Sequence, residues 1–341
     1  MSQGAGVFKL FGNCVPVKGA RRSVICDLQK QRMRFIPNDL FHILTELADL
    51  PADEVKRRFD DRAARVIDEY FALLVADDYG FWCDEPEKFP RMELTWQRPE
   101  AVTNSIIDVD GSSRHDYARI FAELDGLGCQ AVQVRAYEAL SLGELEEIVL
   151  AAEQQRLRHL DLVVKYRPEL TTEALADFCL RHQLISVISI HSSPQKLTHE
   201  VKPLPVFLRY YPGALTPSSC GVVSQGYFSL FMEHFTEAQR FNTCLNRKLS
   251  IAADGTIRNC PSMPQSFGKV GQTSLGSVVR EPALIQIGSI TKDQVKVCRD
   301  CEFRYVCTDC RAYTADADDP YSKPAKCSYD PYTATWGARA A

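Results

Sequence analysis

Four cysteines crowd into a short stretch near the end of the chain, and their thiolates are the strongest candidates for metal chemistry. The stretch is Cys298-x2-Cys301-x5-Cys307-x2-Cys310. Cysteines separated by two residues can place both sulfur atoms on one metal ion. Zinc sites built from two such pairs usually separate the pairs by roughly 12 to 20 residues, whereas five residues separate them here. The crowding therefore favours iron-sulfur clusters held by cysteine thiolates, and a structural zinc site is the alternative.

Three further cysteines extend this arrangement, two upstream at Cys244 and Cys260 and one downstream at Cys327. Residues 249–258 contain Asp254-Gly255, a pair that favours the tight turn of a β-hairpin. Such a hairpin brings Cys244 and Cys260 together at its open end. In a reducing compartment, a local crowd of thiols is better explained by metal binding than by disulfides.

The spacing of these cysteines resembles the SPASM domain, the auxiliary-cluster domain of radical S-adenosylmethionine peptide maturases. The likeness rests on a cysteine, a hairpin glycine, a second cysteine, the crowded quartet and the closing Lys326-Cys327-Ser328-Tyr329-Asp330-Pro331. One departure is that two residues, rather than the more usual three, separate the last two cysteines of the quartet. The resemblance implies two four-iron clusters of the 4Fe-4S type. It assigns Cys244, Cys260 and Cys310 to the first cluster, with Cys220 or an open iron site completing it, and Cys298, Cys301, Cys307 and Cys327 to the second.

The start of the chain resembles the maturases of the grasp-with-spasm system. The similar stretches are Phe11-Gly12-Asn13-Cys14-Val15-Pro16-Val17-Lys18-Gly19, Ile25-Cys26-Asp27-Leu28-Gln29 and Phe35-Ile36-Pro37-Asn38-Asp39-Leu40. Those proteins work with an ATP-grasp ligase on a ribosomally made precursor peptide. The resemblance therefore implies these two partners, and it implies a precursor-recognition element in the amino-terminal unit.

The loop that radical enzymes use to cleave S-adenosylmethionine is missing from this sequence. That loop reads Cys-x3-Cys-x2-Cys and follows the first barrel strand, where this chain has Ile107-Asp108-Val109-Asp110-Gly111-Ser112-Ser113-Arg114-His115. The Gly-Gly-Glu-Pro segment of those enzymes is reduced to Ala136-Tyr137-Glu138-Ala139. We therefore do not expect S-adenosylmethionine cleavage, and the sequence leaves open whether the chain is an enzyme.

Three polar residues at the ends of predicted strands are candidates for acid-base catalysis, namely Glu138, Lys165 and His191. In parallel α/β sheets, the working residues lie in loops at the carboxyl ends of the strands. For each of the three, an ordinary polar loop residue is the alternative.

An α/β fold in three parts is predicted to position these residues. Residues 1–90 form a winged-helix-like unit with strands at 24–28, 32–36 and 79–82 and helices at 39–48, 52–59 and 62–76. Without a basic recognition helix, we expect this unit to bind a peptide along its exposed sheet edge, and a purely structural role is the alternative.

The second and third parts are a partial, degenerate βα barrel at residues 91–235 and the cysteine-rich SPASM domain at residues 236–341. The barrel is indicated by strands and helices that alternate at the spacing of βα units. The strands are predicted at 103–109, 131–135, 160–166 and 185–191, with a fifth near 207–211, and the helices at 114–124, 142–155 and 172–182.

The composition excludes several classes of protein. A chain of 341 residues with 45% hydrophobic and 25% charged residues is typical of a globular protein of about two domains. A net charge of -4 spread over both signs argues against nucleic-acid binding. The longest uncharged run, residues 210–232, contains prolines, glycines and serines, and the start lacks a signal-peptide core. We therefore expect no membrane segment and a cytoplasmic location.

Three hypotheses follow from the sequence. The first is a peptide-maturation protein with a degenerate barrel and two clusters, which either catalyses a step or reduces a partner. The second is a non-catalytic adaptor that presents the precursor to the ATP-grasp ligase, with structural clusters. The third is a zinc-stabilised scaffold outside peptide maturation.

Overall fold

The computed structural model describes residues 6–337, and the chain divides into two compact units. The first, called the composite unit, combines the chain up to Trp96 with Gly221–Thr243 and the segment that begins at Ile290. The second, called the sheet unit, combines Gln97–Cys220 with Cys244–Ser289. The domain limits predicted near residues 90 and 235 stay predictions.

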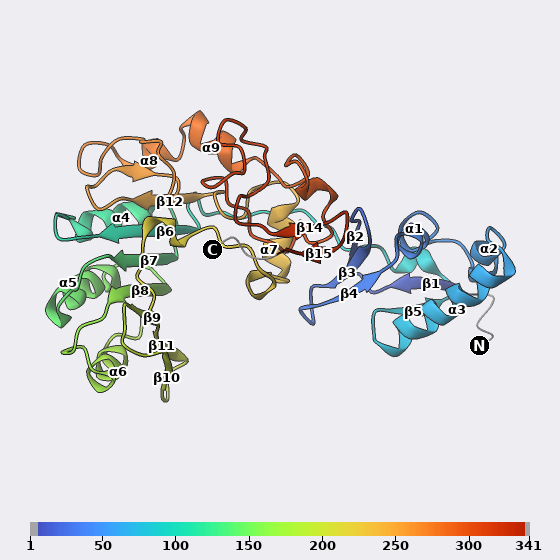
Figure 1. Ribbon diagram of the computed structural model, residues 1–341, viewed down its shortest axis with the longest axis horizontal. Helices are drawn as coiled ribbons and strands as arrows, with labels where there is room; N and C mark the ends of the chain where they lie inside the picture. The colour runs from blue at the N-terminus through green and yellow to red at the C-terminus, as the bar shows by residue number, and fades with distance from the viewer. Residues whose placement is uncertain (1–5, 338–341) are drawn as a thin grey trace. The chain divides into compact units, whose positions relative to one another are not determined.

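The sheet unit is built around eight strands in the order β10-β11-β9-β8-β7-β6-β12-β13 (Figure 1). Neighbours from β11 to β12 run parallel, and the pairs at the two edges run antiparallel. The predicted α/β class is therefore confirmed, with a sheet that is mostly parallel. The strands are β6 (Asn104–Val109), β7 (Ala131–Ala136), β8 (His159–Lys165), β9 (Ile185–His191), β10 (Leu197–Val201), β11 (Val206–Tyr210), β12 (Lys248–Ile251) and β13 (Ile257–Arg258).

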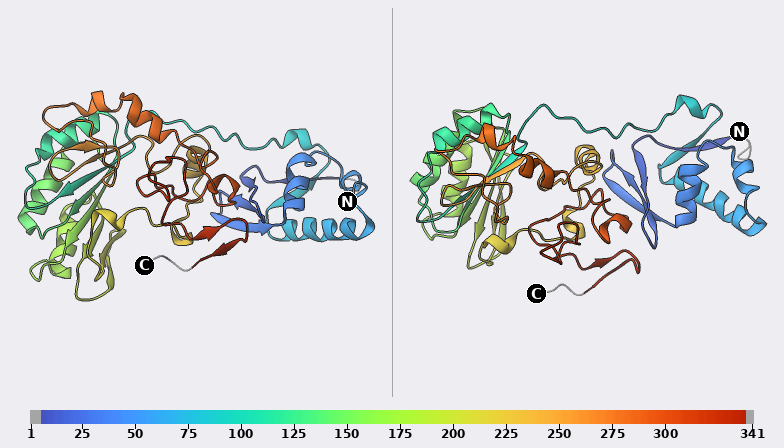
Figure 2. Two further views of the ribbon diagram at one scale, coloured as in Figure 1. Left: turned by 45° about the horizontal axis from the view of Figure 1, so that its top comes forward. Right: turned by 90° about the horizontal axis from the view of Figure 1, so that it is seen from above.

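Helices α4 (Tyr117–Gly126), α5 (Leu142–Glu153) and α6 (Thr172–Arg181) connect the successive strands β6 to β9. Both views of Figure 2 show them on one side of the sheet, as expected when neighbouring parallel strands are joined by crossovers of one hand. Each helix begins at a side chain that accepts a hydrogen bond from a free backbone N–H, namely Asp116, Ser141 and Thr171. Because the four strands are parallel, their carboxyl ends meet at one edge of the sheet.

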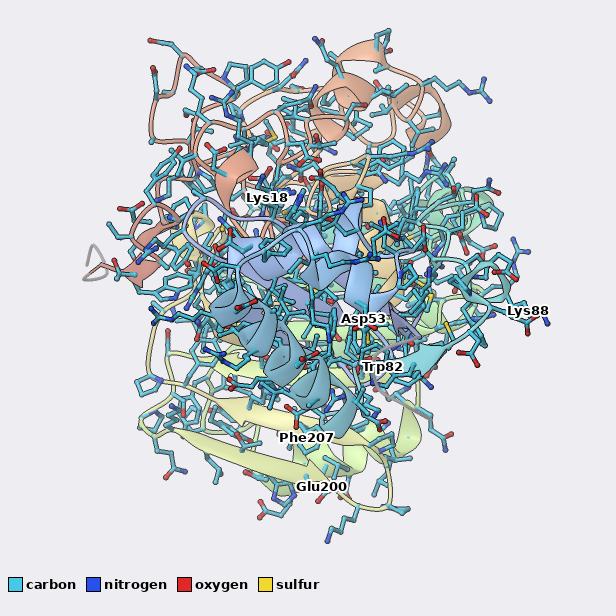
Figure 3. All side chains as sticks on the ribbon, turned by 90° about the vertical axis from the view of Figure 1, so that its right-hand side faces the viewer. Lys18, Asp53, Trp82, Lys88, Glu200 and Phe207 are labelled. Atoms are coloured by element: carbon cyan, nitrogen blue, oxygen red, sulfur yellow. The ribbon has the colours of Figure 1, made fainter. Side chains whose placement is uncertain are left out.

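The two outer hairpins extend this sheet beyond the predicted βα units. At one edge, β10 pairs with β11, and Glu200 lies opposite Phe207 (Figure 3). At the other edge, the predicted hairpin at Asp254-Gly255 is confirmed as β12 and β13, and β12 adds to β6. Gly255 has a φ of 81°, which favours glycine. Hydrogen bonds from the Thr256 N–H and hydroxyl hold the pKa of Asp254 at about 2 and fix the turn.

The amino-terminal part of the composite unit contains the strands and helices that the sequence predicts. Strands β2 (Cys14–Val17), β3 (Ser23–Asp27) and β4 (Arg32–Ile36) form an antiparallel sheet, followed by α1 (Asn38–Glu46), α2 (Ala52–Lys56) and α3 (Asp61–Ala76). The return strand β5 (Gly80–Cys83) pairs with β1 (Val7–Leu10), and the sequence analysis identified neither β1 nor β2. That these elements form a winged helix stays a prediction.

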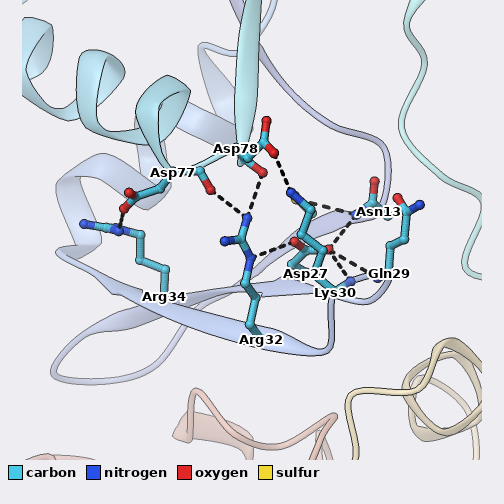
Figure 4. A network of polar contacts seen from close by, with 9 residues as sticks. Asn13, Asp27, Gln29, Lys30, Arg32, Arg34, Asp77 and Asp78 are labelled. Atoms are coloured by element: carbon cyan, nitrogen blue, oxygen red, sulfur yellow. Dashed lines mark hydrogen bonds and ion pairs between the residues drawn. The ribbon is translucent and has the colours of Figure 1, made fainter.

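A polar network ties the β3–β4 hairpin to the end of α3 (Figure 4). The Asp27 carboxylate accepts from Arg32 Nε at 3.0 Å and from backbone N–H groups of the turn. Arg32 also donates to the carbonyl oxygens of Asp77 and Asp78 at 2.6 and 3.0 Å, where a cation complements the helix dipole. Arg34 pairs with the Asp77 carboxylate. The hairpin is therefore held at a fixed position against α3.

The rest of the composite unit is mostly loops with short elements. It shares one hydrophobic core with the amino-terminal sheet, in which Val17 and Val24 pack with Phe235, Phe303 and Tyr329.

No helix in the described part of the chain is long and apolar enough to cross a membrane. The remaining elements of the two units are α7 (Met232–Ala238), α8 (Leu275–Val278), α9 (Pro282–Gly288), β14 (Tyr329–Asp330), β15 (Thr335–Trp336) and short 3-10 turns at Pro86–Lys88, Pro217–Ser219, Gln225–Tyr227 and Cys298–Asp300.

Candidate metal centre

Four cysteines of the composite unit line one pocket, called the four-cysteine pocket: Cys298, Cys301, Cys307 and Cys327. They are the four that the resemblance assigns to the second cluster. None of these four forms a disulfide bond. Four thiols around one space are the donor set of a four-iron cluster, so the chemistry of the residues fits that group.

Tight turns place these thiols. Val297 has a φ of 68°, and the Cys301 N–H donates to the Cys298 carbonyl oxygen at 3.0 Å, which closes a short turn between the first two cysteines. The Cys307 N–H donates to the Phe303 carbonyl oxygen at 3.0 Å. The sulfur of Cys301 also accepts the Phe303 N–H at 3.4 Å. Local backbone turns therefore help to orient Cys298, Cys301 and Cys307.

Aromatic side chains form the wall of this pocket. Phe228, Phe303, Tyr329 and Trp336 line it, and the ring centroids of Phe303 and Tyr329 are 5.1 Å apart. Burial raises the pKa of Cys298 to about 12 and raises the pKa of Cys301 and Cys307 as well. The metal-free thiols therefore keep their protons at neutral pH, and metal binding has to release them.

The amino-terminal loop before β3 contacts this region directly. The Glu302 carboxylate, fully buried, accepts from Arg22 Nε at 2.8 Å and from the Tyr329 hydroxyl at 2.5 Å. The Ala20 N–H donates to the Asp300 carbonyl oxygen at 2.7 Å. The amino-terminal sheet and the cysteine segment are thus parts of one folded unit.

The sheet unit holds a second group of cysteines at Cys244, Cys260 and Cys220. Burial, followed by the nearby charge of Cys244 and then of Cys220, raises the pKa of Cys260 to about 11. The sheet unit therefore brings two of the three predicted first-cluster ligands close to Cys220, the possible fourth. The remaining predicted ligand, Cys310, belongs to the composite unit, where it is buried and where a Cβ on Gly221 would lie 2.8 Å from its sulfur.

Within residues 6–337, no group of three or more His, Cys, Asp or Glu side chains is arranged to hold a single metal ion. In a four-iron cluster, each of the four thiolates binds a different iron atom of the cluster, so they do not share one ion. The sulfur atoms therefore do not have to converge on one point.

A buried ion pair occupies the carboxyl ends of β6 and β7. Arg135 Nε and Nη2 donate to the two oxygens of Asp108 at 2.7 and 2.9 Å, and the Tyr137 hydroxyl donates to Asp108 at 3.0 Å. Arg135 Nη1 donates to the sulfur of Cys220 at 3.1 Å. Burial opposes the charge of Arg135, but the hydrogen bonds to Asp108 outweigh it and raise the Arg135 pKa.

The sequence analysis missed Arg135 because it lies within a strand rather than in a loop. A signal was present in the sequence, because Asp108 and Arg135 lie near the ends of two successive predicted strands; the structure places the two residues in register. An arginine among buried strand residues requires a carboxylate partner, and register supplies one.

The three predicted acid-base candidates lie at or just beyond the carboxyl ends of neighbouring strands, and their catalytic role stays a prediction. His191 is 1% exposed, its Nε2 bonds the Ala136 carbonyl oxygen at 2.9 Å, and its Nδ1 accepts the Leu215 N–H at 3.4 Å. Burial lowers the His191 pKa, so the ring is neutral and both nitrogens serve the fold. Lys165 lies opposite His191 in the sheet but is exposed, as is Glu138, which packs over Gly111.

Comparison with known proteins bears on the cysteine-rich part of the chain. Residues 243–302 match the SPASM family, described as an iron-sulfur cluster-binding domain, which confirms the predicted resemblance. No curated protein matches the chain.

Two solved structures align with most of the chain at low similarity. Streptococcus suis SuiB bound to S-adenosylmethionine is 11% identical with a TM-score of 0.34, covering 89% of this chain and 96% of that one. SuiB bound to its precursor peptide SuiA is 10% identical with a TM-score of 0.38, covering 93% and 98%. These TM-scores are low, and nothing about the function of this chain follows from them.

Proposed function

We propose that this chain is an iron-sulfur protein of ribosomal peptide maturation, which binds a precursor peptide and works with an ATP-grasp ligase. The observation that carries the proposal is the four-cysteine pocket, because two of its cysteines, Cys298 and Cys301, lie in the segment that an iron-sulfur domain family matches. The peptide and the ligase are proposed from the resemblance of the amino-terminal stretches.

Two clusters are proposed, with the ligands that the resemblance implies. Cys298, Cys301, Cys307 and Cys327 would hold one, and Cys244, Cys260 and Cys310 the other, with Cys220 or an open iron site completing it. Such clusters supply one-electron transfer when bound. The protein's own part is to exclude water with the aromatic wall and to orient the thiols by the turns described above.

The precursor peptide is proposed to bind beside β4. This strand is the outer strand of its sheet, so one side of its backbone is available for an added strand. A groove of about 350 Å³ between α1 and α3 begins at Pro37, where β4 ends. Its apolar lining, from Leu40 and Ile43 on α1 and Val66 and Tyr70 on α3, suits hydrophobic side chains of an extended peptide.

One observation favours the adaptor hypothesis as a second candidate. The end of β6, where the related enzymes would carry their triplet of cysteines, holds the Asp108–Arg135 ion pair instead. The buried His191 is also committed to structural hydrogen bonds. An adaptor would bind the precursor and present it to the ligase without reacting with it.

The test of the proposal is to purify the full chain without oxygen and measure its metal content. We expect roughly four to eight irons per chain with matching sulfide, and broad absorption near 400 nm. Stoichiometric zinc without iron, after cluster assembly has been supported in the cell, would reject the cluster hypothesis and support the zinc-stabilised scaffold.

A second measurement separates enzyme from adaptor. The reduced protein is mixed with the precursor peptide encoded beside it, S-adenosylmethionine and, in parallel, the neighbouring ligase. We expect no 5'-deoxyadenosine in any mixture. A mass change of the peptide without ligase would show an enzyme of another type, with Glu138 and Lys165 as the first residues to change. A mass change that needs the ligase would support the adaptor.

A further inference from the structure

Lys292 is a buried lysine that the proposed function leaves without a role. It is 6% exposed and lines the four-cysteine pocket. Its Nζ donates to the carbonyl oxygens of Cys307 and Thr308 at 2.6 and 2.9 Å. The ammonium is therefore fixed against the backbone that carries one of the cysteines.

The carboxylate that also acts on Lys292 is committed elsewhere. Asp309 forms an ion pair with Arg311 at 2.6 Å and accepts from Asn242 at 2.9 Å. Taking an ammonium group out of water is costly unless a negative charge compensates it. The cysteines of the pocket, once they are thiolates, provide that charge.

The second cation of the pocket is already neutralised. Arg304 lines the pocket too, but its Nε pairs with Asp293 at 2.8 Å and its Nη1 donates to the Cys301 carbonyl oxygen at 3.0 Å. Lys292 is therefore the cation whose charge is directed at the thiolates.

We propose that Lys292 is a positioning residue whose ammonium stabilises the reduced state of the cluster in the four-cysteine pocket. This inference rests on the proposed function. Reduction adds one electron from an external reductant, with no bond made or broken, and it increases the negative charge beside Lys292. A fixed buried cation favours the more negative state, so it raises the reduction potential.

The experiment uses the full chain with Cys244→Ser and Cys260→Ser, so that iron in the four-cysteine pocket is measured by itself. Lys292→Gln removes the charge and keeps a hydrogen-bond donor, and Lys292→Met removes both. Lys296→Gln is the matched control, because its side chain is 68% exposed and pairs with Asp319 on the surface. Iron content is measured first, and the midpoint potential is then measured by dithionite titration followed by electron paramagnetic resonance.

We expect all variants to keep about four irons per chain. The equilibrium constant for reduction should fall at least tenfold in Lys292→Gln and Lys292→Met, which is ~59 mV for one electron, and stay unchanged in Lys296→Gln. If the parent without Cys244 and Cys260 holds no iron, the cluster in the four-cysteine pocket is itself wrong. If iron is retained and the potential does not fall, or if both Lys292 variants lose iron while Lys296→Gln keeps it, the role of the charge is overturned and Lys292 serves only the fold.

Discussion

At the scale of single residues, the ion pair of Asp108 and Arg135 shows how costly polar groups can be kept inside the sheet. Both side chains are less than one-tenth exposed, and the two hydrogen bonds between them satisfy both carboxylate oxygens. Bidentate geometry of this kind offsets the cost of burying two charges. Removing one partner leaves the other charge buried without compensation.

We therefore predict that Arg135→Met destabilises the protein by about 3–5 kcal/mol. The double variant Asp108→Leu with Arg135→Met removes both charges and should recover most of that loss. Urea denaturation followed by circular dichroism measures both. A loss below about 1 kcal/mol in the single variant, of the size of an exposed pair, would show that the site is open to water.

His234 on α7 gives a prediction about pH. Burial, and then the nearby Lys292 charge, lowers its pKa to about 4, and its Nε2 has no hydrogen-bond partner among the described residues. In the unfolded chain the pKa is about 6.5. Between these values the unfolded state binds the extra proton, so stability present above pH 6.5 is lost as the pH falls toward 4.

The expected loss from this histidine is on the order of 1–3 kcal/mol between pH 7 and pH 4. Denaturant unfolding at several pH values, compared with His234→Leu, checks it. The variant should show a flatter dependence on pH over that range. Parallel curves for the two proteins would assign the acid sensitivity to other groups.

At the scale of elements, Val66 and Leu73 are two of the exposed hydrophobic residues of helix α3, and they lie in different surroundings. Val66 is 39% exposed and lines the groove between α1 and α3, while Leu73 is 40% exposed and lies outside it. Substituting each of these two residues by aspartate distinguishes a binding role of the groove from a general effect of a new charge on this helix.

We predict that Val66→Asp weakens binding of the precursor's leader segment at least about tenfold, or 1.4 kcal/mol. Leu73→Asp should bind like the unchanged protein. Fluorescence anisotropy with a labelled leader peptide measures both affinities. Equal affinities for the two variants would move the recognition surface away from the groove.

The β12–β13 hairpin supports a second prediction at this scale. Gly255 has a φ of 81°, and a Cβ there would lie 3.2 Å from Val270. Gly255→Val should cost on the order of 1–3 kcal/mol and reduce iron at Cys244 and Cys260, because the turn no longer closes. Gly276→Ala on α8 is the control, since a Cβ there meets no atom within 4 Å. Iron content and thermal unfolding check both variants, and normal iron in Gly255→Val would contradict the role of the turn.

At the scale of the whole molecule, local patterns predicted more than distant contacts. Spacing and turn chemistry predicted the strands β6 to β9 and the hairpin at Gly255, and the resemblance to the SPASM domain implied the four cysteines of the pocket. They could not predict that Glu302 bonds Arg22, or that Val24 packs with Phe303, because those partners are far apart in the chain. The same limit hid the pairing of β1 with β5.

This long-range packing predicts that the amino-terminal sheet depends on the cysteine segment. A chain ending at Ser289 lacks Phe303 and Tyr329, so β2 and β3 lose part of their core. Hydrogen exchange should show reduced protection at Val17 and Val24, while β7 and β8 of the sheet unit stay protected. Unchanged protection at Val17 would show that residues up to Trp96 fold alone.

The composite unit combines three separate stretches of the chain, which affects how it can fold during translation. The sheet unit needs residues only up to Ser289, whereas the core around Val24 and Phe303 can close only after the segment that begins at Ile290 has left the exit tunnel. The apolar surface of the amino-terminal strands therefore stays uncovered until the segment that begins at Ile290 has been made. Chaperones that shield nascent chains would then influence how much of the protein folds.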